Sequence, residues 1–203
     1  MRLYLAARPT ALTIALLVGI GAVTTAARSV PLPAFQPGLG EPYIPVLLAY
    51  LAPVIASVVI GLAAESPMPS WERLAARNLT VTRATHAGGL VLLAGLALLP
   101  ALLLLQDSGA AVRTLPANLF ASAGLTLLAG VLLDPRTGWL LVVPYSVLGL
   151  MAGQTTPAPW RSLLLIDAEP SSRRLAVAAA VLAAGLAVHS LRRPPRPVHG
   201  DTG

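Results

Sequence analysis

The stretch AGGLVLLAGLALLPALLLL, residues 87–105, contains no charged side chain. A helix rises about 1.5 Å per residue and the hydrocarbon core of a bilayer is roughly 30 Å thick, so a run of this length can cross it. Five further blocks are equally free of Asp, Glu, Arg and Lys: residues 10–27, 43–64, 115–133, 138–153 and 175–191. The sequence therefore predicts an all-α integral membrane protein, a single transmembrane domain over residues 1–191 made of a bundle of six transmembrane helices.

The composition also favours a membrane protein. Of 203 residues, 56% are hydrophobic and 11% are charged, whereas soluble domains carry about a quarter charged residues. The chain has no cysteine, which excludes a disulfide framework and a thiolate metal site. It has no lysine either, so a P-loop lysine for ATP phosphates and a Schiff base are excluded. The three histidines stand at predicted helix ends or in the tail, and no metal-ligand motif occurs. We therefore expect no catalytic residue, no cofactor and no metal site in this chain.

The arginines determine the predicted orientation, because basic residues gather on the cytoplasmic side of a membrane. With the N-terminus inside, the cytoplasmic set is Arg2, Arg8, Arg73, Arg77, Arg83, Arg136, Arg192, Arg193 and Arg196, and the outer set is Arg28, Arg113, Arg161, Arg173 and Arg174. This asymmetry predicts a multi-pass protein with both termini cytoplasmic. Heavy use of Arg, Ala, Leu, Gly and Pro indicates a bacterial genome, so the predicted location is a bacterial inner (plasma) membrane. Positions at span ends are typical of contact with lipid headgroups, not of nucleic-acid binding. In the alternative interpretation, residues 1–27 are a signal peptide.

The longest cytoplasmic connection, residues 65–86, has the sequence ESPMPSWERLAARNLTVTRATH. Ser70 can cap a short helix in which Trp71 and Leu74 share one face and charges occupy the rest. The pattern predicts a short cytoplasmic interfacial helix between the second and third spans. This helix would rest on the inner leaflet, dock a soluble partner, or do both.

The outer connection between the fifth and sixth spans, residues 154–174, combines Trp160 with a short apolar run at residues 163–166. A tryptophan at headgroup depth beside such a run indicates a re-entrant or interfacial outer helix, or an ordinary loop with a hydrophobic anchor. Residues 192–203 are rich in proline and arginine, which predicts a disordered basic cytoplasmic tail.

Inside the predicted spans the polar side chains are uncharged, among them Thr13, Tyr50, Ser57, Asn118, Thr126 and Tyr145. Ion-coupled carriers usually place ionisable groups within the membrane, so a self-powered carrier is disfavoured. Two pairs of small residues at four-residue spacing, Ser57/Gly61 and Gly149/Gly153, predict close packing between helices.

A resemblance to a known family rests on short matches spread along the chain. They are Glu65-Ser66-Pro67-Met68-Pro69 with Glu72-Arg73 and Arg83, then Asn118, Gly124-Leu125, Gly138-Trp139 with Pro144, and Trp160 before the last span. In this order the chain resembles the small six-span transmembrane (permease) subunits of actinobacterial ABC exporters, which are like type-two export permeases and carry no ATPase domain of their own.

The resemblance implies a separate cytoplasmic ABC ATPase that binds ATP and Mg and docks on the first cytoplasmic connection. The docking residues would be Glu65, Ser70, Trp71, Glu72, Arg73, Leu74, Arg77 and Arg83. It also implies a second permease chain, either a copy of this one or a related one. The predicted function is thus a transmembrane permease subunit of an ATP-driven exporter, not an enzyme in itself. The alternative is a non-catalytic membrane scaffold or partner subunit of a larger complex, and a membrane enzyme or ion-coupled carrier ranks third.

Overall fold

A computed structural model describes residues 10–30, 48–65, 79–105, 108–134, 137–152, 166 and 172–192. The elements are α2 (Thr10–Ala26), the 3-10 helix η1 (Leu48–Tyr50), α3 (Ala52–Ala64), α5 (Leu79–Leu104), α6 (Ser108–Leu132), α7 (Trp139–Ala152) and α9 (Ser172–Leu191). The described ranges contain no strand, which confirms the all-α prediction for this part of the chain. Each predicted span overlaps one of these α-helices.

Three helices are long and apolar enough to cross a membrane, namely α5, α9 and the Val112–Leu132 part of α6. The others are apolar but shorter. α2, α3 and α7 have 17, 13 and 14 residues, or roughly 26, 20 and 21 Å. α3 is short because Pro53 stands at its first turn, where proline begins a helix, and the preceding residues form η1 instead. Of the six predicted spans, the described helices therefore supply three of full length.

Three hydrogen bonds from arginines to helix-end carbonyls fix how the helices run. Nε of Arg28 donates to the carbonyl of Leu104 over 3.3 Å, so α2 and α5 end side by side. Nη1 of Arg83 donates to the carbonyl of Arg192 over 2.6 Å, which places the start of α5 beside the end of α9. Nη1 of Arg192 donates to the carbonyl of Gly130 over 3.2 Å, near the end of α6. We call these two ends of the bundle the Arg28 end and the Arg192 end.

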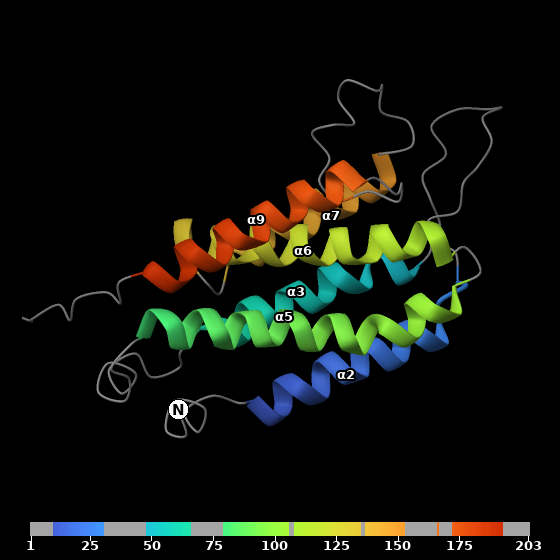
Figure 1. Ribbon diagram of the computed structural model, residues 1–203, viewed down its shortest axis with the longest axis horizontal. Helices are drawn as coiled ribbons and strands as arrows, with labels where there is room; N and C mark the ends of the chain where they lie inside the picture. Colours follow the sequence, from blue (N-terminus) through green and yellow to red (C-terminus); the bar gives the residue numbers. More distant parts are fainter. Residues whose placement is uncertain are drawn as a thin grey trace, which may run out of the picture.

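α3 and α7 carry the chain back through the bundle. The chain leaves α2 at the Arg28 end and enters α5 at the Arg192 end, and α3 runs in that direction, parallel to α6. The chain leaves α6 at the Arg192 end and enters α9 at the Arg28 end, and α7 starts at the Arg192 end, where Gly138 lies against Gly130. Figure 1 shows the helices lying lengthwise beside one another, α2 along one side and α9 along the other. The described chain therefore passes through the bundle six times.

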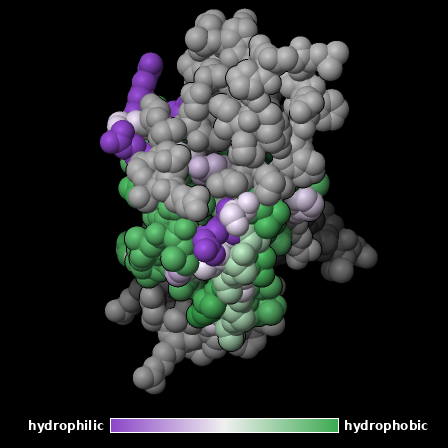
Figure 2. Space-filling model, turned by 90° about the vertical axis from the view of Figure 1, so that its right-hand side faces the viewer, coloured by the Kyte–Doolittle hydropathy of each residue, from purple (hydrophilic) through white to green (hydrophobic). Residues whose placement is uncertain are grey.

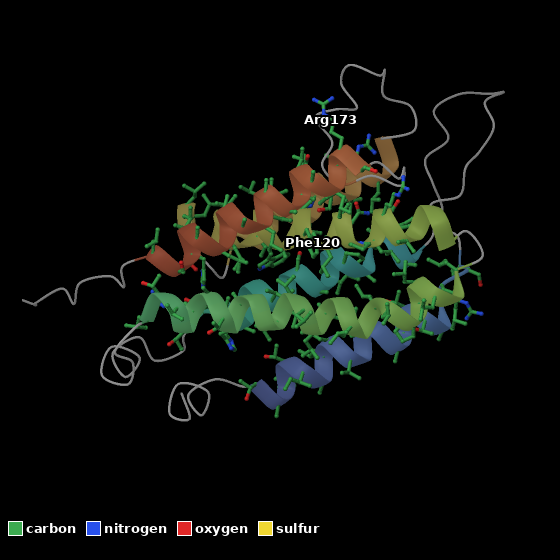
Figure 3. The ribbon with its side chains drawn as sticks, in the orientation of Figure 1. Phe120 and Arg173 are labelled. Atoms are coloured by element: carbon green, nitrogen blue, oxygen red, sulfur yellow. The ribbon has the colours of Figure 1, made fainter. Side chains whose placement is uncertain are left out.

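Helix α6 is the centre of the bundle and contacts α3, α5, α7 and α9. Two apolar clusters form around it, and Phe120 in the middle of α6 packs against both (Figure 3). The first cluster includes Ile166, the one described residue of the outer connection before Ser172, which is fully buried. The apolar run predicted at residues 163–166 thus reaches the core at its last residue.

The closest helix crossings depend on glycine. A Cβ atom on Gly185 of α9 would lie 2.6 Å from the carbonyl oxygen of Gly124 on α6, and one on Gly124 would lie 2.7 Å from the backbone of Val181. In the same way, a Cβ on Gly21 of α2 would lie 2.2 Å from the carbonyl oxygen of Ala97 on α5. In each crossing the backbones touch, because no side chain stands between them.

Large apolar side chains point outward from every α-helix. Examples are Leu12, Val18 and Val23 of α2, Ile55 and Leu62 of α3, Leu92 and Leu103 of α5, Leu132 of α6, Leu140 and Leu148 of α7, and Val177 and Leu191 of α9. Soluble monomers rarely expose contiguous apolar patches above a few hundred Å². A surface that is apolar around the whole bundle is compatible with a membrane protein.

The charged residues of the described part gather at the two ends. Arg28, Arg113, Arg173 and Arg174 belong to the Arg28 end, and Glu65, Arg83, Asp134 and Arg192 belong to the Arg192 end. Figure 2 views the Arg28 end and shows strongly hydrophilic residues there beside hydrophobic ones. Arg173, in the first turn of α9, extends away from the bundle (Figure 3). Between the two ends, the described helices hold no Asp, Glu, Arg or Lys.

Candidate functional site

Five uncharged polar side chains are buried on α3 and along one face of α6, and we call them the polar seam. They are Ser57 of α3 and Thr114, Asn118, Ser122 and Thr126 of α6, each between 0% and 2% exposed. The four residues of α6 recur at every fourth position. Residues four apart lie above one another on a helix, so these side chains form a stripe along one face of α6.

One hydroxyl chain of the polar seam crosses between the helices. Oγ1 of Thr126 donates to Oγ of Ser57 over 3.3 Å, and Oγ of Ser57 donates to the carbonyl of Val54 over 2.7 Å. Each hydroxyl therefore has an acceptor for its proton, as buried polar groups require. The chain links α6 to the first turns of α3.

A second contact between the two helices lies one turn closer to their N-terminal ends. Oγ of Ser122 is 2.7 Å and 3.3 Å from the carbonyl oxygens of Asn118 and Leu119 in its own helix, and 3.2 Å from that of Pro53 in α3. A serine hydroxyl has one proton, so the three acceptors share it and the nearest one takes the larger part. Because α3 and α6 pair at Pro53 with Ser122 and at Ser57 with Thr126, they run parallel.

Gly61 lets Thr126 approach α3 this closely. A Cβ on Gly61 would lie 2.4 Å from Cγ2 of Thr126, well inside van der Waals contact. Ser57 and Gly61 stand four residues apart on α3 and lie on either side of that threonine. The predicted Ser57/Gly61 pair is therefore found on the face of α3 that packs against α6.

The polar seam can hold and orient helices, but serine, threonine and asparagine do not ionise near neutral pH. Hydrogen bonds between membrane helices contribute about 0.6 kcal/mol on average in measured cycles and about 1–2 kcal/mol in model peptides. Two crossing contacts therefore give a modest attraction that depends strongly on register. Among the described residues, no group of three or more His, Cys, Asp or Glu is placed to hold a metal ion.

Two of the predicted docking residues lie within the described ranges, and the other six lie outside them. Glu65 is the C-cap residue that follows α3, and it is half-buried. Arg83 lies inside α5, which begins at Leu79, and not in a loop as its place in residues 65–86 suggested. Ser70, Trp71, Glu72, Arg73, Leu74 and Arg77 lie outside the described residues, as does the predicted interfacial helix.

The remaining predicted packing pair is only half described. Gly149 is buried in α7, and Gly153 lies outside the described residues. Sequence reasoning missed two members of the polar seam, Thr114 and Ser122, although their spacing from Asn118 and Thr126 was a usable signal. It also missed Gly185, the partner of Gly124.

No protein-family model matches the chain, and neither a curated protein nor a solved structure matches it.

Proposed function

We propose that the protein is the transmembrane permease subunit of an ATP-driven, ABC-type exporter of a bacterial inner membrane and works with a separate ATPase chain that binds ATP and Mg. In this proposal all six α-helices span the bilayer, with both termini cytoplasmic. The Arg192 end then faces the cytoplasm. A second permease, either a copy of this chain or a related one, completes the transporter.

The observation that supports this proposal is the way the helices are joined at the Arg192 end. Residues 66–78 connect the end of α3 to Leu79, the first residue of α5. One turn further along α5, Arg83 is hydrogen-bonded to the carbonyl of Arg192 after α9, and Arg192 is in turn bonded to Gly130 in α6. A force applied to the connection therefore reaches α3 and α5 through the chain, and α9 and α6 through two arginines. A subunit driven by an external ATPase needs such a link.

The unequal helix lengths and the internal prolines suit a bundle that changes shape. The shorter helices α3 and α7 cross the bilayer if they tilt or if it thins locally, at a cost of fractions of a kcal/mol per Å of mismatch. Proline lies inside α5, α6 and α7, at Pro100, Pro116 and Pro144. Each proline removes one helix hydrogen bond, which lowers the cost of bending at that point.

The test is co-purification of the tagged full chain from its own organism, with identification of every bound protein. We expect an ATPase with Walker motifs to be retained by the wild-type chain. The double change Trp71→Ala with Glu72→Arg should reduce its recovery, because buried aromatic anchors commonly contribute 2 kcal/mol or more to an interface. A matched control at the same end of the bundle is Trp139→Ala with Asp134→Arg, which should retain the ATPase. Full retention by the first variant, or no ATPase on the wild-type chain, would contradict the proposal.

A second candidate function is a static scaffold subunit of a larger membrane complex. It is favoured by the backbone contacts at Gly124/Gly185 and Gly21/Ala97, since crossings without intervening side chains resist sliding. The same co-purification separates the two functions. A scaffold would retain other membrane subunits and no ATPase.

A further inference from the structure

A lateral groove of about 410 Å³ opens between α5, α6 and α9. Its lining is apolar throughout and runs from Gly88 to Leu102 along α5. Pro116 and Phe120 of α6 and Leu182 of α9 form the other walls. The lining residue Leu96 is also among the exposed apolar side chains, so the groove is continuous with the outer surface of the bundle.

The groove is long and apolar, as the binding of a hydrocarbon chain requires. From Gly88 to Leu102 the helix rises roughly 21 Å, so the groove follows more than half the length of α5.

Two glycines keep the groove open. Gly88 has no atom within 4 Å of the place its Cβ would take, and for Gly95 the nearest atom is Cδ2 of Leu119 at 3.8 Å. Neither glycine is required by a close backbone approach, in contrast to Gly21, Gly124 and Gly185. Glycine destabilises a helix relative to alanine. At these two positions glycine leaves room in the groove that a side chain would fill.

Arg113 supplies positive charge close to one end of the groove. It is exposed and precedes Pro116 by one turn on the same face of α6 as Phe120. The two acidic residues that the structure describes, Glu65 and Asp134, belong to the opposite end of the bundle. Basic residues beside a crevice between membrane helices are suited to phosphate headgroups.

We propose that the groove binds one acyl chain of an anionic phospholipid, with the lipid phosphate beside Arg113 at the Arg28 end. The apolar lining, which is open to the outer surface of the bundle, favours a hydrocarbon chain, and Arg113 favours a negative headgroup. This site is independent of the exporter proposal, since it requires only that the bundle lies in a membrane.

The experiment is native mass spectrometry of the full chain purified in mild detergent and incubated with equal amounts of dioleoyl phosphatidylglycerol and dioleoyl phosphatidylcholine. We expect the wild-type chain to retain one phosphatidylglycerol. Gly95→Leu, which fills the groove, should lose the retained lipid. Its matched control is Gly89→Leu, because Gly89 also has nothing within 4 Å of its Cβ position but does not line the groove. Arg113→Gln should lower the preference for phosphatidylglycerol about fivefold, the effect of one arginine near a charged membrane surface. The control Arg173→Gln, at the same end, should leave it unchanged.

Size-exclusion chromatography establishes that each variant is folded, and Gly88→Leu replaces Gly95→Leu if the latter is not. Retention of the lipid by folded Gly95→Leu or Gly88→Leu would overturn the groove as the site. Equal retention of both lipids by the wild-type chain, or an unchanged preference in Arg113→Gln, would overturn the role of the arginine. Recovery of a second copy of the chain in place of lipid would overturn the choice of occupant.

Discussion

Replacing Gly185 with alanine should destabilise the bundle, because this glycine allows the backbones of α6 and α9 to touch. The new Cβ would lie 2.6 Å from the carbonyl oxygen of Gly124, whereas ordinary van der Waals contact begins near 3.4 Å. The helices must therefore separate by about 0.8 Å at the crossing. A radial gap of about 0.5–1 Å forfeits a quarter to a half of each dispersion contact. The α6–α9 contact is the most extensive one between described helices, so this loss is spread over many atoms.

Overpacking of this kind typically costs about 1–3 kcal/mol. Alanine also favours the helical backbone over glycine by about 0.5–1 kcal/mol, which offsets part of the cost. Gly89→Ala in α5 is the matched control, since Gly89 is helical but has nothing within 4 Å of its Cβ position. It gains the same backbone preference without the clash. The difference in unfolding free energy between the two variants should therefore be about 1–3 kcal/mol, with Gly185→Ala the less stable.

The assay is equilibrium unfolding of the purified chain in mixed micelles of a mild detergent and increasing sodium dodecyl sulfate, followed by tryptophan fluorescence. If Gly185→Ala unfolds at the same detergent fraction as Gly89→Ala, the backbones of α6 and α9 are not in contact at Gly124. That result would refute the packing of α6 against α9, the most extensive contact between described helices.

Two further predictions concern the other crossings. In the same unfolding assay, Gly21→Ala should be less stable than Gly19→Ala by about 1–3 kcal/mol. The Cβ of the first variant would meet the carbonyl of Ala97, while Gly19 faces open space. Equal stability of the two variants would show that α2 and α5 do not touch there. A double-mutant cycle of Thr126→Val and Ser57→Ala should give a coupling of about 0.6 kcal/mol, the usual value for a hydrogen bond between membrane helices, and a coupling of zero would remove the hydroxyl chain from the polar seam.

The apolar blocks predicted where helices exist, but not where they begin. The helix α5 starts at Leu79, whereas the predicted third span started at residue 87. The residues between them include Arg83 and three threonines, so hydropathy alone excludes them. Helical hydrogen bonding continues past the apolar region, and Arg83 finds an acceptor in the carbonyl of Arg192. At α3 the prediction was too long instead of too short. The predicted second span started at residue 43, whereas α3 begins at Ala52, with Pro53 in its first turn.

The polar seam was accessible to sequence reasoning only in part. Ser57, Asn118 and Thr126 stood out as polar residues within apolar blocks. Asn118 and Thr126 are eight residues apart on α6, and Ser122 lies midway between them on the same face, with its hydroxyl between carbonyls of its own helix and of α3. The pairing with α3 was not accessible, because it depends on which helices are neighbours.

The Gly124/Gly185 crossing shows the same limit more clearly. A small-residue pattern within one helix, such as Ser57 with Gly61, indicates a face that another helix approaches closely. Such a pattern does not identify which helix approaches. Gly185 also has no small residue four positions away, so it shows no such pattern. The contact is between single glycines of two helices far apart in the chain, so only the fold brings it into view.

Labelling of single introduced cysteines tests the six-span bundle most directly, because the chain has no cysteine of its own. Ser29 and Glu65 stand on either side of α3, and Thr137 and Ser172 stand on either side of α7. With a membrane-impermeant maleimide on intact cells, we expect labelling of Ser29→Cys and Ser172→Cys. Glu65→Cys and Thr137→Cys should react only after permeabilisation. Labelling of all four positions from the same side would show that α3 and α7 do not cross the bilayer, and the six-span bundle with its cytoplasmic Arg192 end would have to be abandoned.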